Sequence, residues 1–186
     1  MTVVGADGLQ RCSWATAAPE YIEYHDTEWG KPIRNDVGLF ERMTLEGFQS
    51  GLSWITILRK RENFRTAFAR FDPAVIAAYG QDDFDRLMGD PGIVRNRAKI
   101  NATITNARAL LELDEGELTD LLWSFSLEDR PAPKTGAEVP ATTPESVAMS
   151  KALKKKGFVF IGPTTSYALM QATGIVNDHL ATCIAR

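Results

Sequence analysis

The run Asp90-Pro91-Gly92-Ile93-Val94-Arg95-Asn96 (residues 90–96) separates two amphipathic segments of the chain. Asp, Pro and Gly in succession are typical of a tight turn. The segment that follows, about 96–113, has apolar residues at helical spacing, namely Ile100, Ile104, Ala107 and Leu111. The segment before the turn, 82–88, predicts a shorter helix. The sequence therefore predicts two helices joined by a tight turn.

Helical patterns continue on both sides of this turn. Asn35 or Asp36 can cap a helix that runs to about residue 49, with Leu39, Phe40 and Met43 on its apolar face. Further helices are predicted over residues 19–29, 54–68, 73–78, 117–125, 144–156, 165–172 and 177–186. Residues 1–10 predict a flexible tail, the four-proline stretch 129–144 a loop, and 158–161 a short extended piece. Because alternation with period two is nearly absent, we expect an all-α fold in one domain, residues 11–186.

Composition limits the class of protein. The chain has 186 residues, of which 44% are hydrophobic and 24% charged, which is ordinary for a globular domain and excludes a disordered or disulfide-dense chain. No apolar run is long enough to cross a membrane, and no secretory signal is evident. We therefore expect a cytoplasmic protein without a membrane partner. The net charge of -3 argues weakly against a general nucleic-acid coat but leaves room for a local basic patch.

The chain has only two cysteines and two histidines, which are Cys12, His25, His179 and Cys183. On a helix, residues four apart share a face, so His179 and Cys183 could hold one metal ion together. If all four converged they would form a Cys2His2 zinc site with no position left for water, which is a structural site. Unrelated core cysteines and surface histidines are about equally consistent with the spacing. A Cys12–Cys183 disulfide is a weaker third reading in a reducing cell.

Glu46 stands within the apolar stripe of the helix predicted over residues 36–49. A buried carboxylate is costly unless it is paired or functional. Many of the aromatic residues are nearby in sequence, at Trp14, Tyr21, Tyr24, Trp29 and Trp54. One acid among ring faces suits a planar cationic ligand. The competing interpretation, modestly favoured on these residues alone, pairs Glu46 with a basic residue and places the rings in the core.

Basic residues gather in three clusters, at Arg59–Arg65, at Arg95, Arg97 and Lys99 after the turn, and at Lys151–Lys156. Acidic residues concentrate elsewhere, so the net charge is an average over separated patches. A glycine turn that opens a helix beside cations can offer backbone N–H groups to a phosphate. For any single cluster, a solvated helix face is the more common explanation.

Motifs along nearly the whole chain resemble 3-methyladenine DNA glycosylase I, a family of helix-hairpin-helix DNA glycosylases. They are Cys12-Ser13-Trp14, Tyr24-His25-Asp26-x-Glu28-Trp29-Gly30, Leu45-Glu46-Gly47-x-Gln49-x-Gly51-Leu52-Ser53-Trp54, Lys60-Arg61-Glu62-Asn63, Gly92-Ile93-x-Arg95, Lys151-Ala152-Leu153-Lys154-Lys155 and Val176-Asn177-Asp178-His179. The resemblance starts near Arg11 and reaches the C-terminus. It implies a divergent all-α helix-hairpin-helix fold, with one structural Zn²⁺ that joins the N- and C-terminal segments through Cys12, His25, His179 and Cys183.

The resemblance also implies roles for individual residues. Glu46 would act on the base, which would be bound by Tyr24, Trp54, Trp14, Tyr21 and Trp29. DNA would contact Gln49 and Leu52 as candidate wedge residues, Gly92 in the hairpin turn, and the cations Arg95, Arg97 and Lys99. The implied activity is hydrolysis of the N-glycosidic bond of 3-methyladenine, flipped out of alkylated double-stranded DNA. We expect a monofunctional, monomeric base excision repair enzyme of the bacterial cytosol, with no catalytic cofactor and no lyase step.

Two rival functions remain at this stage. A zinc-stabilised helical module that only binds DNA would need the cations but no buried acid in a ring-lined pocket. A nucleoside or sugar N-glycosidase would need that pocket but not the cations beside Gly92.

Overall fold

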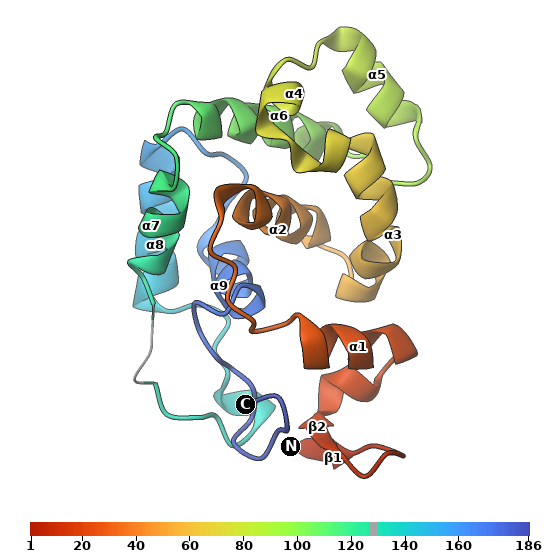
Figure 1. Ribbon diagram of the computed structural model, residues 1–186, viewed down its shortest axis with the longest axis vertical. Coiled ribbons are helices and arrows are strands. Elements are labelled where there is room, and N and C mark those ends of the chain that lie inside the picture. The colour runs from red at the N-terminus through yellow and green to blue at the C-terminus, as the bar shows by residue number, and fades with distance from the viewer. Residues whose placement is uncertain (127–129) are drawn as a thin grey trace.

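The computed structural model describes residues 1–126 and 130–186 and is predominantly helical (Figure 1). The helices in chain order are α1 (Pro19–Thr27), α2 (Asp36–Gln49), α3 (Trp54–Ala67), α4 (Pro73–Ala77), α5 (Gln81–Gly89), α6 (Arg97–Leu111), α7 (Glu117–Trp123), α8 (Pro144–Lys155) and α9 (Pro163–Ala172). Short 3-10 turns lie at Ser13–Thr16, Ala69–Phe71 and Gly136–Glu138. The predominantly helical class expected from the sequence is therefore confirmed.

Helix α2 lies at the centre of the other helices and packs against α3, α6, α7 and α9 (Figure 1). Its start follows from the sequence, because the Asn35 side chain accepts a hydrogen bond of 2.7 Å from the Gly38 N–H. The apolar stripe Leu39, Phe40 and Met43 is almost completely buried. Because Glu46 continues this stripe by one turn, the fold carries its carboxylate inward.

The turn at residues 90–96 joins α5 to α6 as the sequence predicts. Asn96 caps α6 by accepting a hydrogen bond of 3.1 Å from the Lys99 N–H. The turn is tight at Gly92, where a Cβ atom would lie 2.8 Å from Asp90 Oδ1 and 3.1 Å from the Asn63 Cβ. Only glycine therefore fits this position without movement of its neighbours.

Two terminal segments differ from the sequence-based expectations. Residues 1–10 supply β1 (Thr2–Val4), which pairs antiparallel with β2 (Gln10–Cys12), so the predicted tail is instead half of a hairpin. Residues 177–186 are not helical, because the His179 N–H donates to Asn177 Oδ1 and the Leu180 N–H to Cys12 Sγ. The last segment instead runs beside the hairpin, where the Ile184 N–H donates to the Gln10 carbonyl at 2.8 Å.

Smaller differences concern two other segments. Residues 158–161 form no strand, although Phe158 and Ile161 are buried. For the helix predicted over residues 54–68, the sequence predicts apolar core positions at Ile55, Leu58 and Phe68; in α3 and the residue after it, Ile57, Phe64 and Phe68 are fully buried, whereas Ile55 and Leu58 are only partly buried. Residue 129, the first of the predicted loop 129–144, lies outside the described residues. From residue 130 to residue 143 the only regular element is the short 3-10 turn Gly136–Glu138. Across the described ranges, no helix combines the length and apolar character needed to cross a bilayer.

Candidate active site and metal centre

A cavity of about 300 Å³ opens between α1, α2, α9 and the start of α3. Its wall contains all of the predicted base-binding rings together with the predicted acid. The lining residues are Trp14, Tyr21, Tyr24, Trp29, Glu46, Gln49, Trp54, Ala168 and Gln171. The structure therefore brings together residues that are up to 157 positions apart by their numbers, from Trp14 to Gln171. The size and the mixture of rings and few polar groups are typical of a small-molecule site.

Glu46 is the acidic residue of this cavity, and 6% of its surface is exposed. Burial raises the pKa of its carboxyl from 4.5 to about 7, although the nearby Arg42 guanidinium opposes this rise. No ion pair or hydrogen bond to the Glu46 carboxylate is found among residues 1–126 and 130–186. The alternative that Glu46 simply pairs with a basic residue is therefore wrong. An unpaired buried acid facing a cavity is a typical feature of a functional site.

Arg42, one turn before Glu46 on α2, is occupied by other partners. Its guanidinium donates to the Tyr24 hydroxyl at 3.1 Å and forms an ion pair with Glu28 at 3.4 Å. Glu28 is also bound by Arg61 at 2.5 Å. These contacts fix the Tyr24 ring at the cavity wall, where burial raises the pKa of its hydroxyl above the ordinary value.

The rings of the cavity wall contact one another at tilted or edge-on angles. Tyr24 lies 5.4 Å from Trp54 between ring centres, and Trp14 lies 5.6 Å from Tyr21 and 5.1 Å from Trp29. The Tyr21 hydroxyl accepts a hydrogen bond of 2.7 Å from the Ile55 N–H, which joins α1 to the start of α3. Rings held in this way form a rigid apolar wall against which a planar aromatic ligand can pack.

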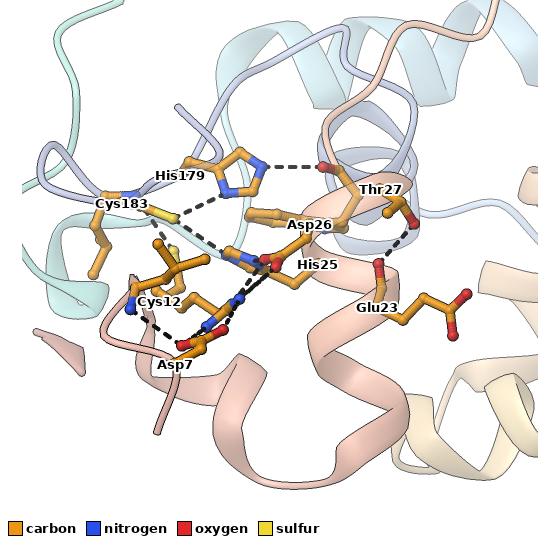
Figure 2. Close-up of polar contacts among 12 residues, drawn as sticks. Asp7, Cys12, Glu23, His25, Asp26, Thr27, His179 and Cys183 are labelled. Carbon is orange, nitrogen blue, oxygen red and sulfur yellow. Dashed lines mark hydrogen bonds and ion pairs between the residues drawn. The ribbon is translucent and has the colours of Figure 1, made fainter. Parts of the chain in front are cut away.

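Cys12, His25, His179 and Cys183 form a buried group at the hairpin end of the molecule, and Figure 2 shows them facing one another. One ligand atom from each lies within 4.8 Å of the other three. Cys183 Sγ is 3.3 Å from His25 Nε2 and 3.6 Å from His179 Nδ1, close to the roughly 3.5 Å expected between sulfur and nitrogen ligands on one tetrahedral zinc. Both cysteines are free, so the disulfide alternative is wrong.

The second ring nitrogen of each histidine is held by a hydrogen-bond acceptor. His25 Nδ1 donates to Asp26 Oδ1 at 2.7 Å, and His179 Nε2 donates to the Trp29 carbonyl at 3.0 Å (Figure 2). Asp26 is in turn bound by the buried Arg11, whose hydrogen bonds lower the pKa of Asp26 and keep it an acceptor. Each histidine therefore directs its remaining nitrogen towards the cysteines, which is the arrangement that metal-ligating histidines adopt.

The metal-ligand group and the cavity share a wall. Trp29 lies 4.7 Å from the His179 ring and 5.1 Å from Trp14, and Trp14 lies 5.2 Å from His25. Trp14 and Trp29 therefore touch the ligand residues on one side and line the cavity on the other. No pattern in the amino-acid sequence predicts this adjacency.

The predicted DNA-contact residues fall into two groups in the structure. Arg95 and Arg97 are exposed beside the turn, and Leu52 is 39% exposed next to the cavity residue Gln49, whose side chain donates to the Leu52 carbonyl at 2.9 Å. The Gly92 N–H donates to Asp90 Oδ1 at 2.7 Å, so a phosphate would have to replace that carboxylate oxygen.

Lys99 does not belong to this exposed surface, and its prediction as a DNA-binding cation is corrected. It is 7% exposed, and its Nζ donates to the carbonyls of Phe48 and Ser50 at 2.8 and 2.7 Å. These carbonyls lie at the C-terminal end of α2, which a cation stabilises. Lys99 therefore fixes the end of α2 just before the turn that carries Leu52.

The substitution Lys99→Met tests this structural role. It removes both hydrogen bonds and leaves two carbonyls without their donor, so we expect a loss of about 1–3 kcal/mol of unfolding free energy in urea denaturation. Arg97→Met, on an exposed side chain of the same helix, is the control and should change stability by less than about 0.5 kcal/mol. Equal stability of the two variants would contradict the assignment.

Two cavity residues, Ala168 and Gln171, were not predicted from the sequence. They are three positions apart on α9 and so share one face. A signal for Gln171 was present, because it is the one long polar side chain in the apolar run 167–172. Its significance becomes clear only when α9 is packed against the cavity.

The comparisons with known proteins agree with this geometry. The sequence model of the methyladenine glycosylase family matches residues 14–186. DNA-3-methyladenine glycosylase 1 of Escherichia coli (strain K12) is 49% identical over 179 residues, which cover 94% of this chain and 96% of the relative. A crystal structure of 3-methyladenine DNA glycosylase I has a TM-score of 0.90 at 48% identity and covers 95% of this chain and 100% of its own.

A further solved structure, of 3-methyladenine DNA glycosylase I from Staphylococcus aureus, describes 3-methyladenine recognition. It has a TM-score of 0.87 at 34% identity and covers 94% of this chain and 95% of its own. The family match, the identity over almost the full length and the shared fold lead to one conclusion: the chain belongs to the methyladenine glycosylase family.

Proposed function

We propose that this protein is a monofunctional DNA glycosylase that releases 3-methyladenine from alkylated double-stranded DNA and leaves an abasic site. The observation that carries the proposal is the buried, unpaired Glu46 in a ring-lined cavity of about 300 Å³. The relatives named DNA-3-methyladenine glycosylase support the reaction, and a related structure concerns 3-methyladenine recognition. The named relatives come from the bacteria Escherichia coli and Haemophilus influenzae, whose DNA lies in the cytoplasm, so we place the site of action there.

The proposed chemistry follows from the charge of the substrate base. Methylation at N3 gives adenine a positive charge in DNA, so the base is a good leaving group. The nucleotide must first be flipped out of the duplex. The C1′–N9 bond then breaks, both electrons leave with the base and neutralise it, and water adds to C1′ with release of a proton to solvent. This route needs no covalent enzyme intermediate.

Glu46 is the residue we assign to the base. As a carboxylate it attracts the cationic base in a site of low dielectric constant and can accept a hydrogen bond from it. Tyr24 and Trp54 would stack on the base, with Trp14, Tyr21 and Trp29 completing the wall. The rings exclude water, which strengthens the attraction between the acid and the base.

The four residues Cys12, His25, His179 and Cys183 fit a structural Zn²⁺, one per chain. The support is the convergence of their ligand atoms and the orientation of both histidines by hydrogen-bond acceptors. When bound, zinc would supply folding free energy by joining the N- and C-terminal segments. A set of four protein ligands leaves no position for a substrate, so we assign it no catalytic role.

We propose that α5, the turn 90–96 and α6 form a helix-hairpin-helix unit that contacts the DNA backbone. The exposed cations Arg95 and Arg97 would bind phosphates, Gly92 would approach one closely, and Leu52 with Gln49 would enter the gap left by the flipped base. A single DNA site of this kind is compatible with a monomeric protein. The monomeric state stays a prediction.

The phosphate contacts can be tested by the salt dependence of DNA binding. Arg95→Ala should weaken binding to all duplex sequences to the same degree and lower the slope of log affinity against log salt by about one. Fluorescence anisotropy with a labelled duplex measures both. Lys134→Ala, on an exposed lysine of the loop between α7 and α8, is the control. A slope that does not change in Arg95→Ala would remove this residue from the interface.

The decisive experiment for the function is incubation with methylated duplex DNA followed by chromatography of the released bases. Release of 3-methyladenine is expected. A DNA-binding module would bind the duplex and release no base, and a nucleoside glycosidase would act on free methylated nucleosides as well as on DNA. Either result would overturn the proposal.

A further inference from the structure

Gln171 lies between the base cavity and an adjacent second cavity of about 300 Å³. Both cavities are lined by Gln171, Trp14 and Trp29, and the second one is also lined by Asp178 and Leu180. Gln171 and Glu46 bring their polar side chains to the base cavity from two different helices, α9 and α2. Polar groups in this cavity lie among aromatic rings, so they can contact a ligand that the rings hold.

Hydrogen bonds determine which end of the Gln171 carboxamide faces which cavity. Gln171 Nε2 donates to Asp178 Oδ2 at 2.9 Å. Because a carboxylate only accepts hydrogen bonds, the NH₂ group must be the end that faces Asp178. The amide is planar, so Oε1 lies on the opposite branch, and it has no hydrogen-bond donor among residues 1–126 and 130–186. The acceptor is therefore available to a ligand.

Asp178 is itself held in place without help from Gln171. It is 2% exposed, accepts a hydrogen bond of 2.5 Å from the Tyr167 hydroxyl, and pairs with Arg130 at 3.0 Å. The carboxylate is therefore already compensated, and its bond to Gln171 is not needed to satisfy the buried charge. What the bond does provide is a fixed orientation of the amide.

We propose that Gln171 is a specificity residue whose Oε1 accepts a hydrogen bond from the exocyclic amino group of the bound base, and that Asp178 is the residue that positions it. Together with Glu46, it gives the cavity two acceptors, one from α9 and one from α2. Two acceptors suit the two hydrogens of an amino group and disfavour a base that presents a carbonyl oxygen there, because two acceptors facing each other repel. This inference rests on the proposed function, since it assumes a methylated purine in the cavity.

The test compares two ligands that differ only in the amino group. Dissociation constants for 3-methyladenine and for 3-methylpurine, which lacks the 6-amino group, are measured by quenching of tryptophan fluorescence. Gln171→Met keeps the length of the side chain and removes the acceptor. It should weaken binding of 3-methyladenine by about tenfold and of 3-methylpurine by less than about threefold. Gln81→Met on the exposed start of α5 is the control and should leave both constants unchanged.

The outcomes are distinguishable. Equal weakening for both ligands in Gln171→Met would show that the side chain only shapes the cavity, and the inference would be overturned. If the wild-type protein bound neither 3-methyladenine nor 3-methylpurine, the proposed function itself would be wrong. Thermal unfolding identifies a variant that does not fold, in which case Gln171→Ala is measured in the same way.

Asp178→Asn provides the second arm of the test. Asn can donate as well as accept, so it no longer dictates which end of the Gln171 amide faces the cavity. We expect a selective loss for 3-methyladenine that is smaller than in Gln171→Met, because half of the amide orientations remain productive. Adding Asp178→Asn to Gln171→Met should cause no further selective loss. An additive effect of the two substitutions would contradict the positioning role of Asp178.

Discussion

Glu46→Gln is expected to lower the release of 3-methyladenine from methylated duplex DNA by at least about 100-fold, a typical cost of removing one electrostatic group from an active site. The amide keeps the shape of the side chain but cannot carry the negative charge that faces the cationic base. The measurement is kcat/KM for base release with chromatographic detection. Glu115→Gln, which alters an exposed acidic residue, should have the same kcat/KM for base release as the wild-type protein.

The same substitution has an opposite effect on stability. The pKa of Glu46 is raised from 4.5 to about 7 in the folded protein, so the folded state binds more protons than the unfolded state between these values. Stability therefore falls as pH rises through this window. Because glutamine does not titrate, Glu46→Gln should raise the unfolding free energy by about 3 kcal/mol at pH 8 and change it little near pH 4.

The pH dependence of activity provides a further check on Glu46. If the carboxylate is the active form, kcat/KM should rise with pH through about 7, the pKa of this residue in the free protein. Glu46→Gln should lose that rise. A variant that is stabilised at pH 8 and retains full base release would show that the buried acid has no part in the function.

Removal of the proposed zinc is the second change with a large expected effect. Elemental analysis should give about one zinc per chain. Cys183→Ala removes one ligand, and we expect it to lower the melting temperature by about 10 °C, which corresponds to roughly 3–5 kcal/mol for a chain of this size. Thr182→Ala, on the exposed neighbouring residue, is the control and should shift the melting temperature by only a few degrees, about 2 °C.

Activity measured well below the melting temperature separates a structural metal from a catalytic one. Because Trp14 and Trp29 contact both the ligand residues and the cavity, we expect Cys183→Ala to raise KM more than it lowers kcat. A zinc-free protein of unchanged stability would contradict the structural role. Complete loss of activity without loss of stability would indicate that the metal takes part in the reaction.

Local signals explain why much of the helical framework was predictable. Helix α2 begins at its Asn35 cap and follows one apolar stripe, so its bounds and the inward direction of Glu46 follow from residues 35–49 alone. The N-terminal hairpin has no such signal, because each of its strands is only three residues long. Period-two patterns do not emerge from strands so short.

Long-range contacts account for what the sequence could not reveal. Lys99 looked like one of three cations after a turn, but its partners are carbonyls about fifty positions earlier, at Phe48 and Ser50. The C-terminal segment 177–186 was expected to be a helix, which would have placed His179 and Cys183 on one face. The ligand atoms converge although no helix spaces them, since the segment is held by the hairpin and by Asn177.

The placement of the four metal-ligand residues has a consequence for how the chain is made. Two of them lie near the start of the sequence and two near its end, and the hairpin and the last segment are held together around them. A ribosome synthesises the N-terminal pair long before the C-terminal pair exists, and residue 183 must leave the exit tunnel before the set is complete. A chain truncated before residue 179 would therefore lack two of the four ligand residues, although every residue that lines the cavity would already be present.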